Sequence, residues 1–173
     1  MIGAGRIGLK LEFDKKRIKP ASHYGMWTKN KKFELKGICD NQELEKKFKK
    51  EINPKIPFYK DFKKMILAEK PKIVSISTWK DSHFEITNKC LDLGIKVIVL
   101  EKPLANNINE AKNLINKIKK KKARVIVNHR RRFDEDIIDL KKKLENNLIG
   151  EIIQISSFYV YGLLTTGTHL IDT

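Results

Sequence analysis

MIGAGRIG, residues 1–8, opens the chain and places glycines at positions 3, 5 and 8. The spacing G-x-G-x-x-G is typical of the turn between a β-strand and a helix that holds a pyrophosphate, provided that a strand runs into it. Gly3 permits the tight turn, Gly5 allows a pyrophosphate close to the backbone, and Gly8 lets the following segment pack on the sheet. The stretch therefore predicts a dinucleotide site, with a glycine-rich turn that binds no ligand as the alternative.

Only Met1 and Ile2 precede the first glycine. The backbone N–H groups of the stretch, including those of Arg6 and Ile7, are expected to be exposed and to form an anion site. We therefore assign Arg6 and Ile7 to the cofactor site together with the three glycines.

The length of 173 residues accommodates one ordinary domain, or one domain and part of another. Cys39 and Cys90 are too few for a disulfide framework, although a bond between the two stays open. The sequence shows neither a charged-then-apolar leader nor a long apolar span. We therefore expect a reduced, cytoplasmic protein with no membrane partner.

A formal net charge of +16 is typical of proteins that neutralise nucleic-acid phosphates. The basic residues are nevertheless spread through every polar segment instead of being clustered. Most of them are lysines, which lack the fork that arginine uses for bidentate phosphate binding. This pattern favours lysines that fill solvated positions, so no nucleic-acid partner is expected.

Four short segments rich in valine, isoleucine and phenylalanine alternate with polar segments of helical spacing. They are KFELKGICD (32–40), KIVSIST (72–78), KVIVL (96–100) and RVIVN (124–128). Such runs are typical of strands buried on both faces of a parallel sheet. The alternation predicts an α/β fold in which residues 1–128 form a Rossmann-type, doubly wound parallel sheet that binds a dinucleotide.

The polar segments between the strands predict helices at residues 41–50, 61–70, 82–94 and 107–122. Asp61 is the expected N-cap of the second helix. Ser82 and Glu85 form a capping box at the start of the third, and Gly94 ends it. The apolar stripe of the fourth helix comprises Ala111, Leu114, Ile115 and Ile118.

Residues 9–32 are too long for the usual single helix between the first two strands. Pro20 and Ser22 indicate a charged loop followed by a crossover helix that starts near Ser22.

The alternation of apolar strand segments with polar helical segments ends after Asn128. Residues 133–147 have a helical pattern that Gly150 breaks, and EIIQISSFYVYG (151–162) alternates like a strand with one solvated face. We expect residues 129–173 to be the incomplete start of an α+β substrate domain.

Six segments, in this order, resemble the Gfo/Idh/MocA family of nicotinamide-dependent sugar and cyclitol oxidoreductases. They are MIGAGRIG, GICD (37–40), SISTWKDSHFEI (75–86), VLEKPLA (99–105), NHRRRF (128–133) and GTHLID (167–172). The most specific of them is EKPLA, residues 101–105. The resemblance implies further residues before the first glycine and a whole open-sheet substrate domain after the last motif. We therefore expect a fragment truncated at both ends, inactive and poorly soluble on its own, of a protein that is homo-oligomeric at full length.

The resemblance also assigns the cofactor side of the site. Asp40 ends the second strand, where a carboxylate accepts hydrogen bonds from ribose hydroxyls and repels a 2′-phosphate. This favours NAD over NADP, with an ordinary surface aspartate as the alternative. By resemblance, Thr78, Trp79 and His83 follow the cofactor toward the nicotinamide, although His83 could equally be a first-turn helix residue.

Lys102 carries the predicted chemistry, because removal of a hydride from a carbinol carbon requires that the hydroxyl proton leave as well. By resemblance Lys102 reaches the substrate hydroxyl and Glu101 helps to order the cofactor side. A structural, salt-bridged lysine is the alternative.

His169 matches the family's substrate-side histidine, which commonly stands in D-x-G-x-H. Thr165 replaces the aspartate here, so the proton relay must rest on Lys102 and His169, and Thr165 can only donate or accept one hydrogen bond. This makes a simple inositol-type substrate less expected. Arg131, in the run Arg130–Arg132, could hold an anionic substrate group or form a salt bridge between the domains. The spacing of histidines and cysteines predicts no metal site.

The predicted function is hydride transfer between NAD and a secondary hydroxyl of a sugar or sugar derivative, including a nucleotide-linked one. A non-catalytic nucleotide-binding or regulatory protein is the alternative that the missing aspartate supports. Basic nucleic-acid binding is a third class.

Overall fold

A computed structural model describes residues 1–44, 46–156 and 158. The chain divides into two compact units, Met1–His129 and Arg130–Thr173, and each is described by itself. The assignment of residues 129–173 to the start of a substrate domain stays a prediction.

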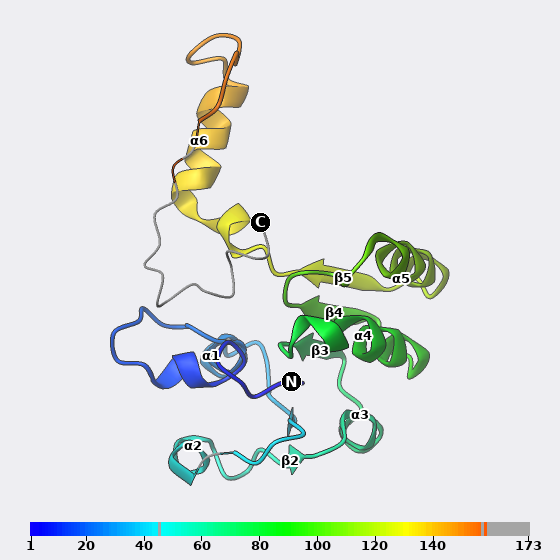
Figure 1. Ribbon diagram of the computed structural model, residues 1–173. Coiled ribbons are helices and arrows are strands. Elements are labelled where there is room, and N and C mark those ends of the chain that lie inside the picture. Colours follow the sequence, from blue (N-terminus) through cyan, green and yellow to red (C-terminus); the bar gives the residue numbers. More distant parts are fainter. Residues whose placement is uncertain (45, 157, 159–173) are drawn as a thin grey trace. The chain divides into compact units, whose positions relative to one another are not determined.

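The first unit contains a parallel sheet (Figure 1). Its strands are β1 (Ile38–Cys39), β2 (Phe58–Tyr59), β3 (Ile73–Ile76), β4 (Val97–Leu100) and β5 (Arg124–Val127). The segments KIVSIST and KVIVL lie side by side as predicted, in a register that pairs Ile73 with Val97 and Ile76 with Leu100. β5 pairs with β4, and β2 pairs with β1, each in parallel.

Ile2 joins the two groups of strands, because it forms parallel bridges to both Cys39 and Ile76. The Ile2 N–H donates to the Ser75 carbonyl at 2.8 Å, and the Gly3 N–H donates to the Cys39 carbonyl at 2.8 Å. The strand order is therefore β2, β1, Ile2, β3, β4, β5. This is the order of doubly wound sheets that bind dinucleotides, so the predicted fold class is confirmed.

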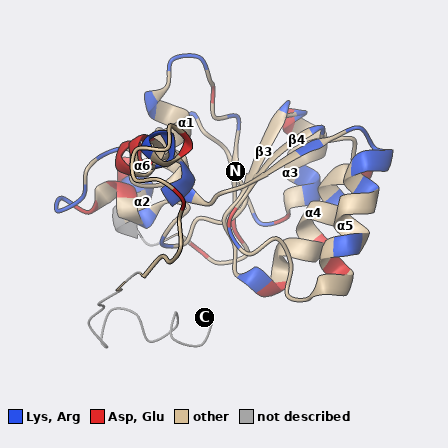
Figure 2. Cartoon of the chain, turned by 90° about the horizontal axis from the view of Figure 1, so that it is seen from above, with Lys and Arg blue, Asp and Glu red and all other residues tan. Residues whose placement is uncertain are grey.

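Helices cover both faces of this sheet. Those of the first unit are η1 (Lys10–Phe13), α1 (His23–Lys29), α2 (Lys46–Glu51), α3 (Phe62–Glu69), η2 (Lys80–Ser82), α4 (His83–Asp92) and α5 (Ile108–Lys120). Figure 2 shows α3, α4 and α5 together on one side of β3 and β4, with α1 and α2 on the other. It also shows lysines and arginines distributed over several elements of this unit.

Two buried clusters correspond to these two faces. The first is largely aliphatic and includes Met65 of α3, Leu91 of α4, Leu114 of α5, and Val74 and Ile98 of the sheet. The second holds Leu9, Tyr24, Ile38, Phe48 and Ile52, and it packs η1, α1 and α2 against β1.

Most predicted helix ends are confirmed. Asp61 caps α3 by accepting from the N–H of Lys63 at 2.7 Å and of Lys64 at 3.3 Å. Ser22 starts α1 and accepts from the Gly25 N–H at 3.0 Å. Gly94 follows α4 with a φ of +85°, a conformation that glycine adopts without strain.

The predicted capping box of Ser82 and Glu85 is wrong. The Ser82 hydroxyl forms no cap bond and lies 2.7 Å from Thr78 Oγ1 and 2.8 Å from the Trp79 carbonyl oxygen. The reason is that a short 3-10 turn, η2, leads directly into α4, so Ser82 has helical backbone angles instead of the extended ones of an N-cap.

Two burial predictions also fail. Arg124 and Ile126 lie on one face of β5 and are exposed, because no described element covers that face, so the strand is not buried on both faces. Ile115 of the predicted stripe on α5 is 41% exposed, because the buried contact of that helix centres on Leu114.

The second unit contains η3 (Arg130–Phe133) and α6 (Glu135–Glu145), and Gly150 follows them at a φ of +72°. The strand predicted at 151–162 is absent from residues 151–156, and residues 157 and 159–162 lie outside the described part. A strand needs a paired neighbour for its backbone groups, and residues 151–156 pair with none. Among the described residues, no helix has the length and apolarity needed to cross a bilayer.

Candidate functional site

The carboxyl ends of the parallel strands meet at one edge of the sheet. Gly3 follows the bridge at Ile2, Asp40 follows β1, Thr78 lies two residues after β3, Glu101 follows β4 and Asn128 follows β5. From Ile2 the chain adds β1 and β2 on one side of the sheet and then β3, β4 and β5 on the other, so the strand order reverses between Ile2 and β3. Open α/β sheets bind ligands outside the strand ends at such a reversal, so this edge is the candidate site.

Steric constraints at the three glycines differ. Gly3 has a φ of +92°, and a Cβ there would lie 2.7 Å from the Ser77 carbonyl oxygen. A Cβ at Gly8 would overlap the Gly3 carbonyl oxygen. A Cβ at Gly5 would meet nothing within 4 Å. Gly3 and Gly8 are therefore needed by the loop itself, whereas Gly5 leaves open space where a ligand can approach the backbone.

The same loop presents unused donors. The Gly5 carbonyl oxygen accepts from the N–H groups of Leu9 at 2.9 Å and Lys10 at 3.1 Å. Within the described part of the chain, the N–H groups of residues 5–8 have no acceptor. Arg6 and Ile7 are exposed. Consecutive free N–H groups form a concavity that suits an anion such as a pyrophosphate, so the loop fits the predicted group.

Asp40 joins the end of β1 to this loop. Its Oδ2 accepts from the Ala4 N–H at 2.7 Å, and its Oδ1 accepts from the Gln42 N–H at 2.9 Å. The side chain is half-exposed. Because each carboxylate oxygen has two acceptor sites, Asp40 keeps capacity for further donors such as ribose hydroxyls.

The segment after β3 places its three predicted residues in different surroundings. Trp79 is 80% exposed and Thr78 is half-buried. His83 is only 1% exposed, and its Nδ1 lies 2.7 Å from the Pro103 carbonyl oxygen while its Nε2 lies 3.2 Å from the Thr78 carbonyl oxygen. His83 therefore holds the loop after β4 beside the loop after β3, from an interior position.

Glu101 lies at the centre of a buried polar cluster. Its Oε1 is 2.9 Å from Nε2 of His23 and accepts from Nδ2 of Asn128 at 2.6 Å. Burial alone would raise the pKa of this carboxyl, but the hydrogen bonds from His23 and Asn128 outweigh it and hold the pKa below its ordinary value. Glu101 is thus an anion that two neighbouring elements fix in place.

Lys102 follows this anchored residue and is exposed. Among the described residues, its ammonium group has no ion-pair partner. The structure therefore leaves the amine of Lys102 available at the strand ends.

His23 and Asn128 are functional candidates that the sequence patterns did not identify. Asn128 ends the predicted strand segment RVIVN, and the rule that polar residues at the carboxyl ends of parallel strands share one edge could have found it. His23 lies 78 residues before Glu101, and no local pattern connects the two.

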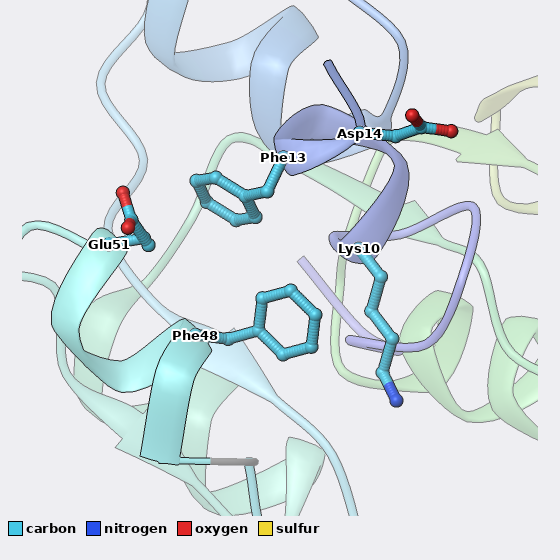
Figure 3. Close-up of a pocket in the computed structure, with 5 residues that line it drawn as sticks. All are labelled: Lys10, Phe13, Asp14, Phe48 and Glu51. Carbon is cyan, nitrogen blue, oxygen red and sulfur yellow. The ribbon is translucent and has the colours of Figure 1, made fainter. Parts of the chain in front are cut away.

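A separate hollow of about 320 Å³ lies between η1 and α2. Figure 3 shows the rings of Phe13 and Phe48 next to each other in its lining, and their centroids are 5.7 Å apart. Lys10 Nζ lies 5.6 Å from the centroid of the Phe48 ring. Asp14 and Glu51 complete the lining, and none of the predicted site residues contributes to it.

The remaining predicted residues are not part of this cluster. Thr165 and His169 lie outside the described residues. Arg131 lies in η3 of the second unit and is exposed.

Cys39 and Cys90 are buried free thiols and form no disulfide. Burial raises the pKa of the Cys39 thiol to about 11 and that of the Cys90 thiol to about 12. In the described residues, no three histidine, cysteine or carboxylate side chains converge as a metal site would require.

Comparison with known proteins agrees with this geometry. Residues 1–129 match the sequence profile of the oxidoreductase family with an NAD-binding Rossmann fold, GFO_IDH_MocA. The uncharacterized oxidoreductase YhhX of Escherichia coli is 34% identical over 106 residues, which are 61% of this chain and 30% of that protein. D-glucoside 3-dehydrogenase of E. coli is 28% identical over 152 residues, which are 88% of this chain and 40% of that protein.

A solved structure shows the same fold. Scyllo-inositol dehydrogenase from Lactobacillus casei, crystallised with bound cofactor NAD(H) and scyllo-inositol, superposes with a TM-score of 0.73 at 20% identity. The match covers 87% of this chain and 41% of that one. The chain thus spans less than half the length of each of these proteins. From its fold, its glycine-rich loop and the profile match over residues 1–129, the chain belongs to the Gfo/Idh/MocA family of NAD-binding oxidoreductases.

Proposed function

We propose that this protein catalyses the reversible oxidation of a secondary hydroxyl of a sugar or sugar derivative, with NAD as hydride acceptor and Lys102 as proton acceptor. The observation that carries the proposal is the exposed Lys102 at the sheet edge where the glycine-rich loop presents free N–H groups. The named relatives that act on a glucoside and on scyllo-inositol support the substrate class.

The bound cofactor would supply the acceptor for the hydride. The backbone of residues 5–8 would bind its pyrophosphate, and Asp40 would accept from the ribose hydroxyls, which favours NAD over NADP. Glu101 would order the cofactor side from its fixed position. Thr78, Trp79 and His83 would form or support the wall toward the reacting ring.

The proton follows a separate route. As the hydride leaves the carbinol carbon, the C–O bond becomes a carbonyl and the hydroxyl proton passes to Nζ of Lys102, which accepts it in the neutral amine form. His169 would assist the relay, Thr165 would contribute one hydrogen bond to the substrate, and Arg131 would bind an anionic group of it. A secondary hydroxyl on a charged or otherwise elaborated sugar fits these side chains.

We also propose that the protein works in the cytoplasm as a homo-oligomer.

The cofactor part is tested by titration with NADH and NADPH, followed by fluorescence. Gly5→Ala should weaken NADH binding at least tenfold and leave the thermal unfolding midpoint unchanged, because the new methyl group meets only the space assigned to the ligand. Asp40→Ser should weaken NADH more than NADPH. Unchanged NADH affinity in Gly5→Ala would remove this loop from the proposal.

The catalytic part is tested on the full-length protein with NAD and a panel of polyols that includes inositols, methyl glucosides, sugar acids and nucleotide-linked sugars. Lys102→Ala should retain NADH affinity and lose at least a hundredfold in kcat. Lys112→Ala, an exposed position on α5, is the matched control and should behave as wild type. NADH binding without turnover of any polyol would favour the non-catalytic alternative. Salt-dependent binding of duplex DNA without NADH binding would favour a nucleic-acid-binding protein, the third class considered above.

A further inference from the structure

We propose that His23 is a positioning residue for Lys102, which couples the glycine-rich loop to the segment that carries the lysine. The inference rests on the proposed function for its catalytic consequence, but not for the physical coupling. It concerns a residue that enters neither the cofactor nor the substrate contacts described above.

The side chain of His23 bonds to one part of the site. His23 is 3% exposed, and its Nε2 lies 2.9 Å from Oε1 of Glu101. A carboxylate without a proton only accepts, so Nε2 must be the nitrogen that donates. The same oxygen accepts from Asn128, which fixes the carboxylate from two directions. Within the described residues the other ring nitrogen of His23, Nδ1, is buried and has no hydrogen-bond partner.

The main chain of the same residue bonds to another part. The His23 N–H donates to the Ile7 carbonyl oxygen at 3.1 Å, and the next N–H, of Tyr24, donates to the Gly8 carbonyl oxygen at 2.9 Å. The first turn of α1 is therefore docked on the glycine-rich loop. One residue thus contacts the pyrophosphate loop through its backbone and the segment after β4 through its ring.

Other contacts hold α1 rigidly enough for this role. Trp27 donates from Nε1 to the Ser75 hydroxyl at 2.8 Å, which ties the helix to β3. The Glu101 N–H donates to the Ile76 carbonyl oxygen at 2.9 Å, so the backbone of Glu101 is also tied to β3. The side chain of Glu101 is held by His23 and Asn128, and the backbone N–H of Lys102 also interacts with its carboxylate.

The consequence concerns the residue next in the chain. Lys102 leaves the sheet directly after Glu101, and its backbone N–H interacts with the Glu101 carboxylate. A shift of that carboxylate therefore shifts the backbone from which the lysine side chain extends. A displacement of a catalytic group by about 1 Å can cost about a hundredfold in rate. Removal of the His23 ring should therefore lower kcat without removing any group that touches substrate or cofactor.

The coupling itself is tested by amide hydrogen exchange of the full chain, read by mass spectrometry. In His23→Ala, peptides that cover residues 101–105 should exchange at least tenfold faster than in wild type, whereas peptides of β3 should not change. Ser22→Ala is the matched control, because it removes the cap of the same helix and leaves the His23 ring in place. That variant should accelerate exchange in α1 only. Equal exchange of residues 101–105 in His23→Ala and wild type would overturn the proposal.

The catalytic consequence is tested in the turnover assay with NAD and the polyol panel. His23→Ala should lower kcat about tenfold or more with an unchanged Kd for NADH, and His23→Gln, whose amide nitrogen can replace Nε2 as a donor, should restore most of it. No rescue by glutamine, or an equal loss in Ser22→Ala, would reduce His23 to a general structural role and overturn the proposal. If the full-length wild-type protein shows no turnover, the proposed function fails, while the exchange experiment still decides whether the coupling exists.

Discussion

The two faces of the sheet are held by different kinds of interaction. On the face covered by α3, α4 and α5, the buried side chains are mostly apolar and the helices are regular, with His83 and Thr87 as buried polar exceptions. On the face covered by η1, α1 and α2, the elements are short, aromatic rings pack at tilted angles, and Glu12 and His23 are buried. The first face is stabilised mainly by apolar burial. The second depends in addition on specific polar contacts, and it carries His23, which bonds to Glu101.

Glu12 illustrates the second kind of interaction. Its carboxylate accepts from the Ala21 N–H at 2.9 Å and from the Ser22 hydroxyl at 3.1 Å, and it forms an ion pair with Lys29 at 3.0 Å. It occupies the space beside Gly25, where a Cβ would overlap it. These contacts hold the loop before α1 on the start of that helix. On this face, polar contacts of Glu12 thus fix the loop in place, whereas on the opposite face regular amphipathic helices pack through apolar side chains.

The largest expected effect is on the aliphatic face. Leu114→Ala removes a side chain that is fully buried, so the free energy of unfolding should fall by about 2–5 kcal/mol. Leu67→Ala, at a position that is 63% exposed, is the matched control and should stay within about 0.5 kcal/mol of wild type. Urea unfolding measures both. Similar losses in the two variants would show that α3 and α5 do not pack as described.

A smaller effect is expected from Gly25→Ala on the polar face. The new methyl group must displace the Glu12 carboxylate and leave its donors unpaired, at a cost of about 1–3 kcal/mol. The cost should largely disappear in a Glu12→Ala background, because the overlapping group is then absent. A double-mutant cycle of unfolding free energies measures this coupling. Additive losses would contradict the contact between the two residues.

Loss of a helix N-cap can be compared directly between the faces. Ser22→Ala and Asp61→Ala should each cost about 0.5–2 kcal/mol. The loss should be larger for Ser22, which is buried and also bonded to Glu12, than for Asp61, whose hydrogen bonds are exposed. Thermal unfolding of the two variants ranks them. The reverse order would weaken the distinction drawn between the faces.

The smallest expected effect is a pH dependence of the free energy of unfolding that comes from Glu12. Burial alone would raise its pKa, but hydrogen bonds from Ala21, Lys29 and Ser22 outweigh it and hold the pKa below its ordinary value of 4.5. Because the folded pKa is lower than the unfolded one, the carboxylate stabilises the fold above pH 4.5, and this contribution is lost as the pH falls through the folded pKa. Glu12→Gln should therefore show a shallower loss of stability on acidification. The free energy of unfolding measured against pH tests this prediction, and parallel curves for Glu12→Gln and wild type would contradict it.

The sequence patterns predicted those features of the fold that are set by a few neighbouring residues in the chain. KVIVL and KIVSIST are strands, Asp61 caps α3 and Gly94 ends α4. The patterns failed where a neighbour decides the outcome. Ser82 does not cap α4 because it belongs to the 3-10 turn that leads into that helix, and Arg124 and Ile126 are exposed because no described element covers their face of β5.

The candidate site divides in the same way. The glycines, Asp40, Glu101 and Lys102 follow recognisable strands, so their common edge could be deduced from chain order. The contact of His23 with Glu101 could not, since it joins residues 78 positions apart and depends on where the short helix α1 docks.

The sequence by itself determined the fold class and the family, because these follow from periodicity, glycine spacing and motif order along the chain. Only the tertiary structure decided which residues fix Glu101, and which glycine leaves room for a ligand. Those properties depend on distances between segments that are remote in sequence. A hydrogen bond or a steric overlap is set by a few tenths of an ångström, and the packing of the whole unit fixes that distance.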